Sequence, residues 1–201
     1  MRNFNEKYSL VRVLHALVSG EELDVYIDGF PFYMDVRFAQ FTPYIYVPEG
    51  NHIFSVYLKD ERDSPLSEVS IDVKNDELIT AAIIEKNDKV DILPILEKMG
   101  VPEDNTSKIK FVHLVPEAPN VNILMGGEEI FNNVGYTDYT EYENVPIGEY
   151  KMDIELTENK KIILSNLVNI NPNRIYTFYI IGILPNIDMI QTLDGATFLQ
   201  W

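Results

Sequence analysis

Short runs in which apolar and polar residues alternate recur along the whole chain. In residues 41–47 the odd positions carry Phe, Pro, Ile and Val, whereas the even positions carry Thr and Tyr. A period of two is typical of a strand with one buried face. Long runs of apolar residues at the 3.6-residue spacing of a helix are missing, so the pattern predicts an all-β protein.

Turn signals divide the chain into many short strands. Asp28-Gly29 is a hairpin signal, and residues 47–50 place Pro and Gly where a tight turn favours them. The expected strands cover residues 10–16, 23–28, 32–36, 41–47, 53–58, 69–73, 78–84 and 90–93, and then 109–115, 121–125, 129–134, 139–145, 150–156, 162–170, 174–181 and 187–193. Strands of this length and spacing predict β-sandwiches.

The second half of the chain repeats the first. His15 and Gly50 recur as His113 and Gly148, both 98 positions later (113 − 15 and 148 − 50). The other pairs at this spacing are Gly29/Gly127, Val36/Val134, Thr42/Thr140, Tyr44/Tyr142, Val47/Val145, Pro48/Pro146 and Leu58/Leu156, followed at a spacing of 97 (177 − 80) by Thr80/Thr177, Ile83/Ile180, Ile84/Ile181, Asp91/Asp188 and Leu96/Leu193. A repeat of this length is a whole domain.

The repeat and the strand pattern together predict the architecture. We expect two tandem, antiparallel, immunoglobulin-like or transthyretin-like β-sandwich domains at residues 8–98 and 108–201. The polar, turn-rich residues 99–107 are expected to form a short hinge between them.

Charge and cysteine content narrow the classes of function. Acidic residues number 32 against 16 basic residues, which gives a net charge of −16. This charge repels phosphate backbones and anionic lipid surfaces, so we expect no nucleic-acid partner. The absence of Cys excludes disulfides, thiolate zinc sites and Cys nucleophiles. The acid-rich turns lack a calcium-loop pattern and differ between the repeats, so we expect no metal site and no cofactor.

The sequence predicts no membrane span. No stretch approaches the roughly 18 apolar residues that a span needs. Residues 1–8 contain no apolar signal core. We therefore expect synthesis in the cytoplasm and leave the final compartment open, with a cell or spore surface among the alternatives.

Three runs of the first repeat resemble a known family. They are VRVLHA at residues 11–16, LDVYIDG at 23–29 and YIYVPEG at 44–50. Members of the DUF4397 family of uncharacterised bacterial domains commonly have a "VRVVHASP…VDVYVDG" run followed by a "V-P-x-G-x-Y" turn, and residues 111–123 are a weaker version. The resemblance implies immunoglobulin-like or transthyretin-like sandwiches that often stand on cell surfaces. It implies no activity.

No catalytic centre is predicted. His15 and His113 are equivalent and are candidates for metal-ligating or acid–base groups, but an acidic neighbour of the first is not repeated near the second, since Asp24 corresponds to Asn122. Neither a nucleophile elbow nor a phosphate loop is present. We therefore expect a non-enzymatic protein in which both histidines are structural, with the imidazole hydrogen-bonded to a neighbouring loop.

Aromatic residues are the strongest candidates for a binding surface. Tyr136, Tyr139 and Tyr142 lie among acids and threonines, and Tyr44 and Tyr46 belong to the matching stretch of the first repeat. Tyr offers apolar area and a hydroxyl, so these residues suit a protein partner or a sugar ring. In the alternative interpretation, half of them point inward and the rest cover a strand pair.

A second candidate surface is the C-terminal segment. Phe198 and Trp201 are large apolar residues, which we expect to dock on their own sandwich or on the sheet edge of a neighbouring chain. The leading hypothesis is a structural or protein-interaction protein, with a protein partner or self-association, in a cell-surface or spore-surface assembly. The alternative is a carbohydrate-binding module that binds a glycan through its tyrosine-rich faces.

Overall fold

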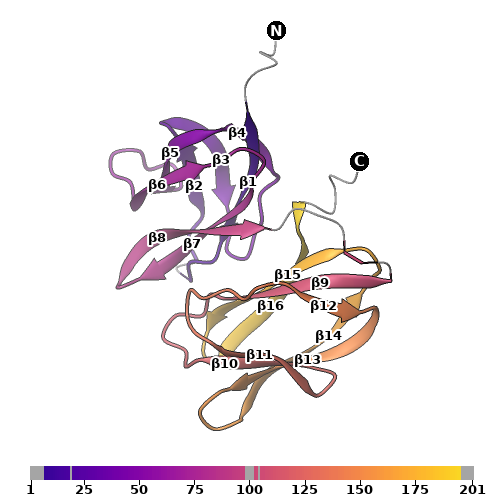
Figure 1. Cartoon of the computed structure of the whole chain (residues 1–201). Coiled ribbons are helices and arrows are strands. Elements are labelled where there is room, and N and C mark those ends of the chain that lie inside the picture. Colours follow the sequence, from indigo (N-terminus) through magenta and orange to yellow (C-terminus); the bar gives the residue numbers. More distant parts are fainter. Residues whose placement is uncertain (1–6, 19, 98–101, 104, 196–201) are drawn as a thin grey trace. The chain divides into compact units, whose positions relative to one another are not determined.

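The computed structural model describes residues 7–18, 20–97, 102–103 and 105–195 (Figure 1). The chain divides into two compact units, Met1–Met99 (unit 1) and Gly100–Trp201 (unit 2). The described residues form β-strands and no α-helix, which confirms the all-β prediction. No helix in this part of the chain is long and apolar enough to cross a membrane. Phe198 and Trp201 lie outside the described residues.

Within the described ranges, each unit contributes eight strands. Unit 1 contains β1 (Tyr8–His15), β2 (Leu23–Ile27), β3 (Phe30–Val36), β4 (Ile45–Pro48), β5 (Gly50–Leu58), β6 (Ser67–Val73), β7 (Leu78–Lys86) and β8 (Lys89–Glu97). Unit 2 contains β9 (Thr106–His113), β10 (Val121–Met125), β11 (Glu128–Val134), β12 (Glu143–Pro146), β13 (Gly148–Leu156), β14 (Ile162–Ile170), β15 (Ile175–Ile183) and β16 (Asn186–Leu193). Strand β9 thus begins inside the segment predicted to be the hinge.

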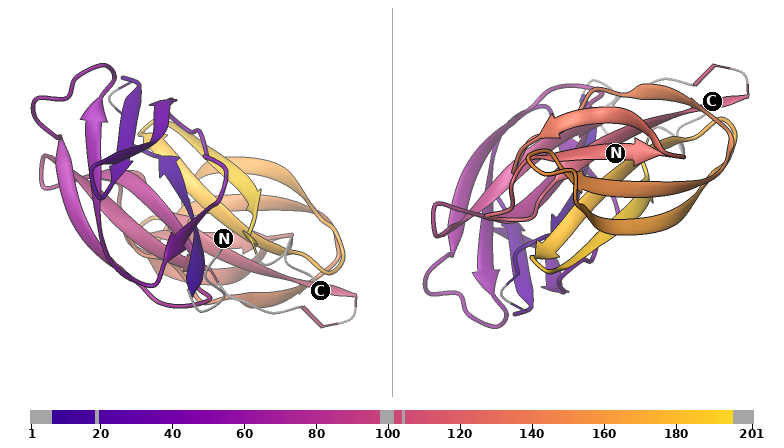
Figure 2. Two further views of the ribbon diagram at one scale, coloured as in Figure 1. Left: turned by 90° about the horizontal axis from the view of Figure 1, so that it is seen from above. Right: turned by 90° about the horizontal axis from the view of Figure 1, so that it is seen from below.

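Each unit is a sandwich of two four-stranded sheets. Unit 1 has the orders β4-β1-β7-β8 and β3-β2-β5-β6, and unit 2 has the equivalent orders β12-β9-β15-β16 and β11-β10-β13-β14. The two sheets of each unit face each other across its core (Figure 2). In immunoglobulin domains the first two strands share a sheet. Here β1 and β2 lie in opposite sheets, so the strand order differs from that of an immunoglobulin domain. Of the two expected types of sandwich, the transthyretin-like one remains.

Among the described strands, one pair in each unit departs from the expected antiparallel pairing. Strand β1 pairs in parallel with β7, from Leu10↔Leu78 to His15↔Ile83, and β9 pairs in the same way with β15. The prediction of wholly antiparallel sheets is corrected at these pairs. Strand β7 follows β6, which lies in the other sheet, so no hairpin fixes its direction relative to β1.

Each unit has its own hydrophobic core, to which both sheets contribute. In unit 1 the core includes Val13 and Ala81, whereas the equivalent positions of unit 2 hold Phe111 and Phe178, whose rings stack with centroids 6.1 Å apart. The strand frame is therefore repeated although the residues that fill it differ in size.

The first hairpin of each unit has the turn that the sequence predicts. Asp28 and Gly29 have φ angles of 53° and 77°, and Gly126 and Gly127 have φ angles of 63° and 90°. A two-residue turn with positive φ at both positions matches the twist of the strands that it joins. This geometry explains why Gly29 recurs as Gly127.

Strand β4 is shorter than the predicted strand at residues 41–47. Pro43 has no N–H group to donate to a ladder, and continuous pairing starts only at Ile45. The Thr42 hydroxyl accepts a hydrogen bond from the Val13 N–H group (2.8 Å), and Thr140 does the same in unit 2. A side chain thus supplies a contact that the backbone ladder lacks.

A buried side chain holds the end of strand β3. Asp24 accepts hydrogen bonds from the N–H groups of Asp35 (3.0 Å) and Asp60 (3.3 Å). In unit 2, Asn122 accepts one from the N–H group of Asn133 (2.9 Å). Asp35 and Asn133 have φ angles of 56° and 52°, which Asp and Asn tolerate. The Asp-to-Asn difference between the repeats therefore preserves an oxygen acceptor and a backbone conformation.

Candidate functional site

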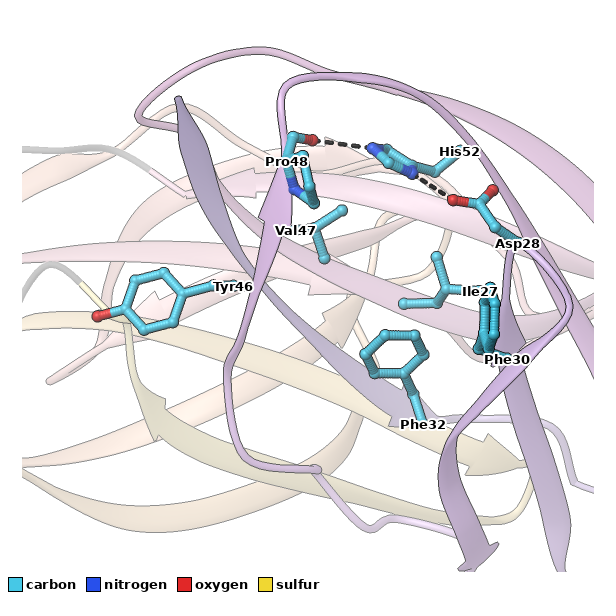
Figure 3. A pocket seen from close by; sticks show the side chains of 8 residues that line it. All are labelled: Ile27, Asp28, Phe30, Phe32, Tyr46, Val47, Pro48 and His52. Atoms are coloured by element: carbon cyan, nitrogen blue, oxygen red, sulfur yellow. Dashed lines mark hydrogen bonds and ion pairs between the residues drawn. The ribbon is translucent and has the colours of Figure 1, made fainter. Parts of the chain in front are cut away.

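A cavity of about 160 Å³ lies beside the two edge strands β3 and β4 of unit 1 (Figure 3). The buried side chains of Ile27 and Val47 form its apolar base. Phe30 and Phe32 project from β3, with 69% and 43% of their surfaces exposed. Alternate residues of a strand share a face, which is why both rings line the same cavity. We call this cavity the aromatic pocket.

Polar groups at the rim of the aromatic pocket bind one another. The Nδ1 atom of His52, on β5, lies 2.6 Å from Oδ2 of Asp28, and its Nε2 atom lies 2.8 Å from the Pro48 carbonyl oxygen (Figure 3). The Ile53 N–H group donates to Oδ1 of Asp28 at 2.9 Å. Both ring nitrogens face acceptors, so both contacts are hydrogen bonds only when His52 is an imidazolium.

The ionisation of Asp28 follows from these contacts. Burial acts to raise the pKa of Asp28, but hydrogen bonds from His52 and from the Ile53 N–H group outweigh it and hold this pKa below its ordinary value of 3.8. The rim therefore carries a carboxylate at neutral pH, and its lone pairs are partly used within the protein.

Tyr33 ties β3 to the segment that leads into β4. Its side chain is buried, and its hydroxyl donates a hydrogen bond to the Pro43 carbonyl oxygen at 2.7 Å. Burial raises the pKa of Tyr33 above 10.0. The equivalent residue of unit 2, Phe131 (131 − 33 = 98), lacks this hydroxyl. The link thus belongs to the unit that has the aromatic pocket.

Tyr46 lies at the margin of the aromatic pocket. Its side chain is 63% exposed and points away from Phe30 and Phe32 (Figure 3). It packs edge to face with Tyr8, with ring centroids 6.3 Å apart. This predicted interaction residue is therefore accessible, but the walls of the pocket come from two phenylalanines that the tyrosine-centred prediction did not include.

The aromatic walls are not repeated in unit 2. At the spacing of 98, Phe30 and Phe32 correspond to Glu128 and Ile130, Asp28 to Gly126, Tyr46 to Asn144 and His52 to Tyr150. Duplication has preserved the strands and turns at this place and changed the exposed side chains. The aromatic pocket is a property of unit 1.

Tyr44 belongs to a buried polar network. Its hydroxyl lies 2.7 Å from each carboxylate oxygen of Glu97, which also accepts a hydrogen bond from Thr80 (2.6 Å). The Arg12 guanidinium forms an ion pair with Glu97 (3.1 Å) and lies 4.7 Å from the centroid of the Tyr44 ring. The ring and hydroxyl of Tyr44 are thus both engaged within unit 1.

Tyr142 has the same neighbours in unit 2. Its hydroxyl donates to Asp194, which also accepts a hydrogen bond from Thr177 (3.0 Å), and its ring lies 4.7 Å from Nζ of Lys110. Lys110 is equivalent to Arg12 (110 − 12 = 98). The search for identical residues missed this repeated network of a cation, a tyrosine and a carboxylate. The cation and the carboxylate keep their charge between the repeats but change their residue type.

The two remaining tyrosines of the predicted surface have different surroundings. The Tyr136 ring packs edge-on against His113, with centroids 6.3 Å apart. Tyr139 is 43% exposed, and its ring lies 5.6 Å from Nζ of Lys110. Of the residues predicted to form tyrosine-rich faces, Tyr136 and Tyr139 thus have separate contacts within unit 2.

Both duplicated histidines are fully buried. Nε2 of His15 lies 2.9 Å from the Glu21 carbonyl oxygen, which confirms for this histidine the predicted bond to a neighbouring loop. Nδ1 of His113 accepts a hydrogen bond from the Val115 N–H group (3.2 Å). Burial lowers the pKa of both imidazoles below 6.5. In the part of the chain that the structure describes, no group of three or more His, Cys, Asp or Glu side chains could hold a metal ion.

The fold and the site define a tandem β-sandwich protein with an aromatic pocket on its first domain. The profile of the family described as "Domain of unknown function (DUF4397)" matches residues 9–124 and 107–198. The chain therefore belongs to the DUF4397 family, and the two matched segments agree with two copies of its domain. No curated protein matches the chain.

The chain also has a distant similarity to a solved structure. The chain is similar to CBMbc (family CBM26) from Eubacterium rectale Amy13K, whose crystal structure was determined in complex with maltoheptaose. The identity is 8%, the alignment covers 94% of this chain and 99% of the other, and the TM-score is 0.31. A similarity at this level carries no argument about ligands.

Proposed function

We propose that this chain is a non-enzymatic protein-interaction protein, and that unit 1 binds an apolar side chain of a partner polypeptide in the aromatic pocket. The observation that supports this most directly is the chemistry of the pocket: two exposed phenylalanine rings of β3 border an apolar base, while the polar groups of the rim bind one another. An engineered apolar cavity of about 150 Å³ binds benzene. A cavity of about 160 Å³ therefore suits one aromatic ring or one branched aliphatic group.

The strength expected of such a contact follows from area burial. One fully buried large apolar side chain contributes about 1.5–3 kcal/mol to binding. That is too little for a stable complex by itself, so the aromatic pocket acts as an anchor within a larger contact surface.

The edge strands favour side-chain docking over strand addition. Pro31 lies within β3 and Pro48 ends β4, and neither residue has an N–H group to donate to an added strand. Proline therefore interrupts any backbone ladder that a partner strand could form with these edges. The proposed contact is instead made by a partner side chain that enters the aromatic pocket.

A glycan is the second candidate ligand, because the exposed rings of Phe30 and Phe32 offer flat faces to a sugar. Sugar hydroxyls need hydrogen-bond partners on the protein. The polar groups nearest to the rings, Asp28 and His52, are already bonded to each other. We therefore prefer a protein partner to a glycan. The proposed location of this interaction is a cell-surface or spore-surface assembly.

The proposal is tested by titrating the isotope-labelled full chain with N-acetyl-phenylalaninamide, N-acetyl-leucinamide and maltoheptaose while amide NMR shifts are recorded. We expect the two amino-acid probes to shift the amides of Ile27 and Val47. In Phe32→Glu these shifts should fall at least about fivefold, because a charged side chain then borders the apolar base.

Ile130→Glu is the matched control, since it makes the same change at the equivalent position of unit 2. It should leave the titration of the aromatic pocket unchanged. Shifts caused by maltoheptaose and not by the amino-acid probes would favour the glycan. Shifts that are the same in Phe32→Glu, or no shifts with any probe, would overturn the proposal.

A further inference from the structure

We propose that the occupant of the aromatic pocket is residues 196–201 of a second copy of this chain, with the ring of Phe198 in the cavity, so that copies associate head to tail. This inference rests on the proposed function of the aromatic pocket and names its partner. The sequence of the segment is Ala-Thr-Phe-Leu-Gln-Trp, which contains three large apolar side chains and no charged side chain.

The first argument is the fit between segment and pocket. The cavity, with a volume of about 160 Å³, has room for one six-membered aromatic ring, by comparison with a benzene-binding cavity of about 150 Å³. The phenyl ring of Phe198 has this size. The neighbouring Leu199 and Trp201 supply further apolar area for the exposed surface of Phe30.

The second argument is that neither part of the contact recurs at the equivalent positions of the other unit. The aromatic walls are present in unit 1, whereas unit 2 has Glu128 and Ile130 at the equivalent positions. The apolar segment likewise follows unit 2 alone, because the residues that follow β8 in unit 1, 98–103, read Lys-Met-Gly-Val-Pro-Glu. A donor segment and an acceptor pocket at different places on each chain give a heterologous contact, which forms open chains or closed rings, the smallest ring being a reciprocal pair.

The third argument is the net charge. Copies that each carry −16 repel one another. An association between them must therefore be held by apolar contacts, and both proposed partners, the segment and the base of the aromatic pocket, are apolar. Salt screens the repulsion and leaves the apolar contact in place. Added salt should thus strengthen the association, whereas it would weaken binding to a basic partner.

The first experiment uses the single Trp of the chain, Trp201, as a reporter. Light scattering and Trp fluorescence are recorded for the full chain over a range of protein concentrations, at low and at high salt. We expect the mean mass to rise with concentration, the Trp emission to shift to shorter wavelength in parallel, and both changes to begin at lower concentration in high salt.

The second experiment tests the head-to-tail geometry by complementation. Phe32→Glu disables the acceptor and keeps the donor segment, and Phe198→Ser disables the donor and keeps the acceptor. Each variant alone should be monomeric. An equimolar mixture should form a dimer and nothing larger, because each dimer has one intact contact and no second one to propagate. Ile130→Glu, the control in unit 2, should associate like the unchanged chain.

The outcomes separate this inference from the proposed function. A chain that stays monomeric at all concentrations, or a mixture of variants that fails to dimerise, overturns the second-copy proposal. If the amino-acid probes still shift Val47 in that case, the aromatic pocket binds another polypeptide and the proposed function stands. If the probes also fail, both proposals fall. A blue-shifted Trp emission in a chain that remains monomeric shows that the segment binds within its own chain, which also overturns the inference.

Discussion

Replacing Asp24 tests whether a single buried carboxylate holds the strand that carries the aromatic pocket. Its side chain is 1% exposed and accepts two backbone hydrogen bonds, from Asp35 at 3.0 Å and from Asp60 at 3.3 Å. A hydrogen bond to a charged group contributes about 1.5–3 kcal/mol, with the longer bond at the low end. Asp24→Ala removes both bonds, so we expect a loss of about 3 kcal/mol in the free energy of unfolding.

Asp24→Asn is the matched variant, because unit 2 has Asn122 at this position. The amide oxygen preserves the shorter bond to Asp35, while the NH₂ group cannot accept the longer bond. The expected loss is therefore about 1.5 kcal/mol, the low end of that range. Urea unfolding followed by circular dichroism measures both values. Equal losses in the two variants would refute the reasoning, since they would show that charge or packing, and not the oxygen acceptor, is what this position requires.

Two further predictions concern the buried histidines and a tight hairpin. Burial holds the pKa of His15 and His113 below 6.5 in the folded protein, so the unfolded chain binds more protons as the pH falls below that value. The thermal midpoint, measured by differential scanning calorimetry, should therefore decrease between about pH 7 and pH 5. A His15→Gln/His113→Gln variant should show a shallower pH dependence, and an unchanged slope would contradict the prediction. Gly182 has a φ of 101°, and a Cβ atom there would lie 2.5 Å from the Asn186 carbonyl oxygen, so Gly182→Ala should cost at least about 2 kcal/mol in urea unfolding. Gly127→Ala, at a φ of 90° with no heavy atom within 4 Å of the added Cβ, is its control and should cost about 1 kcal/mol; equal losses would show that the close approach at Gly182 is not the cause.

The difference between the two units suggests how this fold changes its surface without changing its frame. Gly29 and Gly127, Thr42 and Thr140, and the Asp24/Asn122 pair each serve a backbone contact, and each is preserved or exchanged for a residue with the same acceptor. The walls of the aromatic pocket, Phe30 and Phe32, are not preserved: Glu128 and Ile130 stand at the equivalent positions of unit 2. The repeat thus preserves residues that support the backbone at these positions and does not preserve the exposed rings.

The sequence alone determined most of the frame. The period-two pattern, the turn residues and the spacing of 98 predict local strand positions and a duplicated sandwich, because these features depend on neighbouring residues. A comparison of side-chain charge, and not only of residue identity, between the repeats would also have revealed the pairs Arg12/Lys110 and Glu97/Asp194. The two residues of each pair have the same charge at the repeat spacing.

Only the tertiary structure decided which strands are edges and which aromatic rings are exposed. Tyr44 and Tyr46 stand two residues apart in one alternating run, yet Tyr44 is bound to Glu97 and Tyr46 is largely exposed. The parallel pairing of β1 with β7 and the position of β3 beside β4 join residues far apart in sequence. Local patterns carry no information on such contacts, so the aromatic pocket could be found only once the strands were paired.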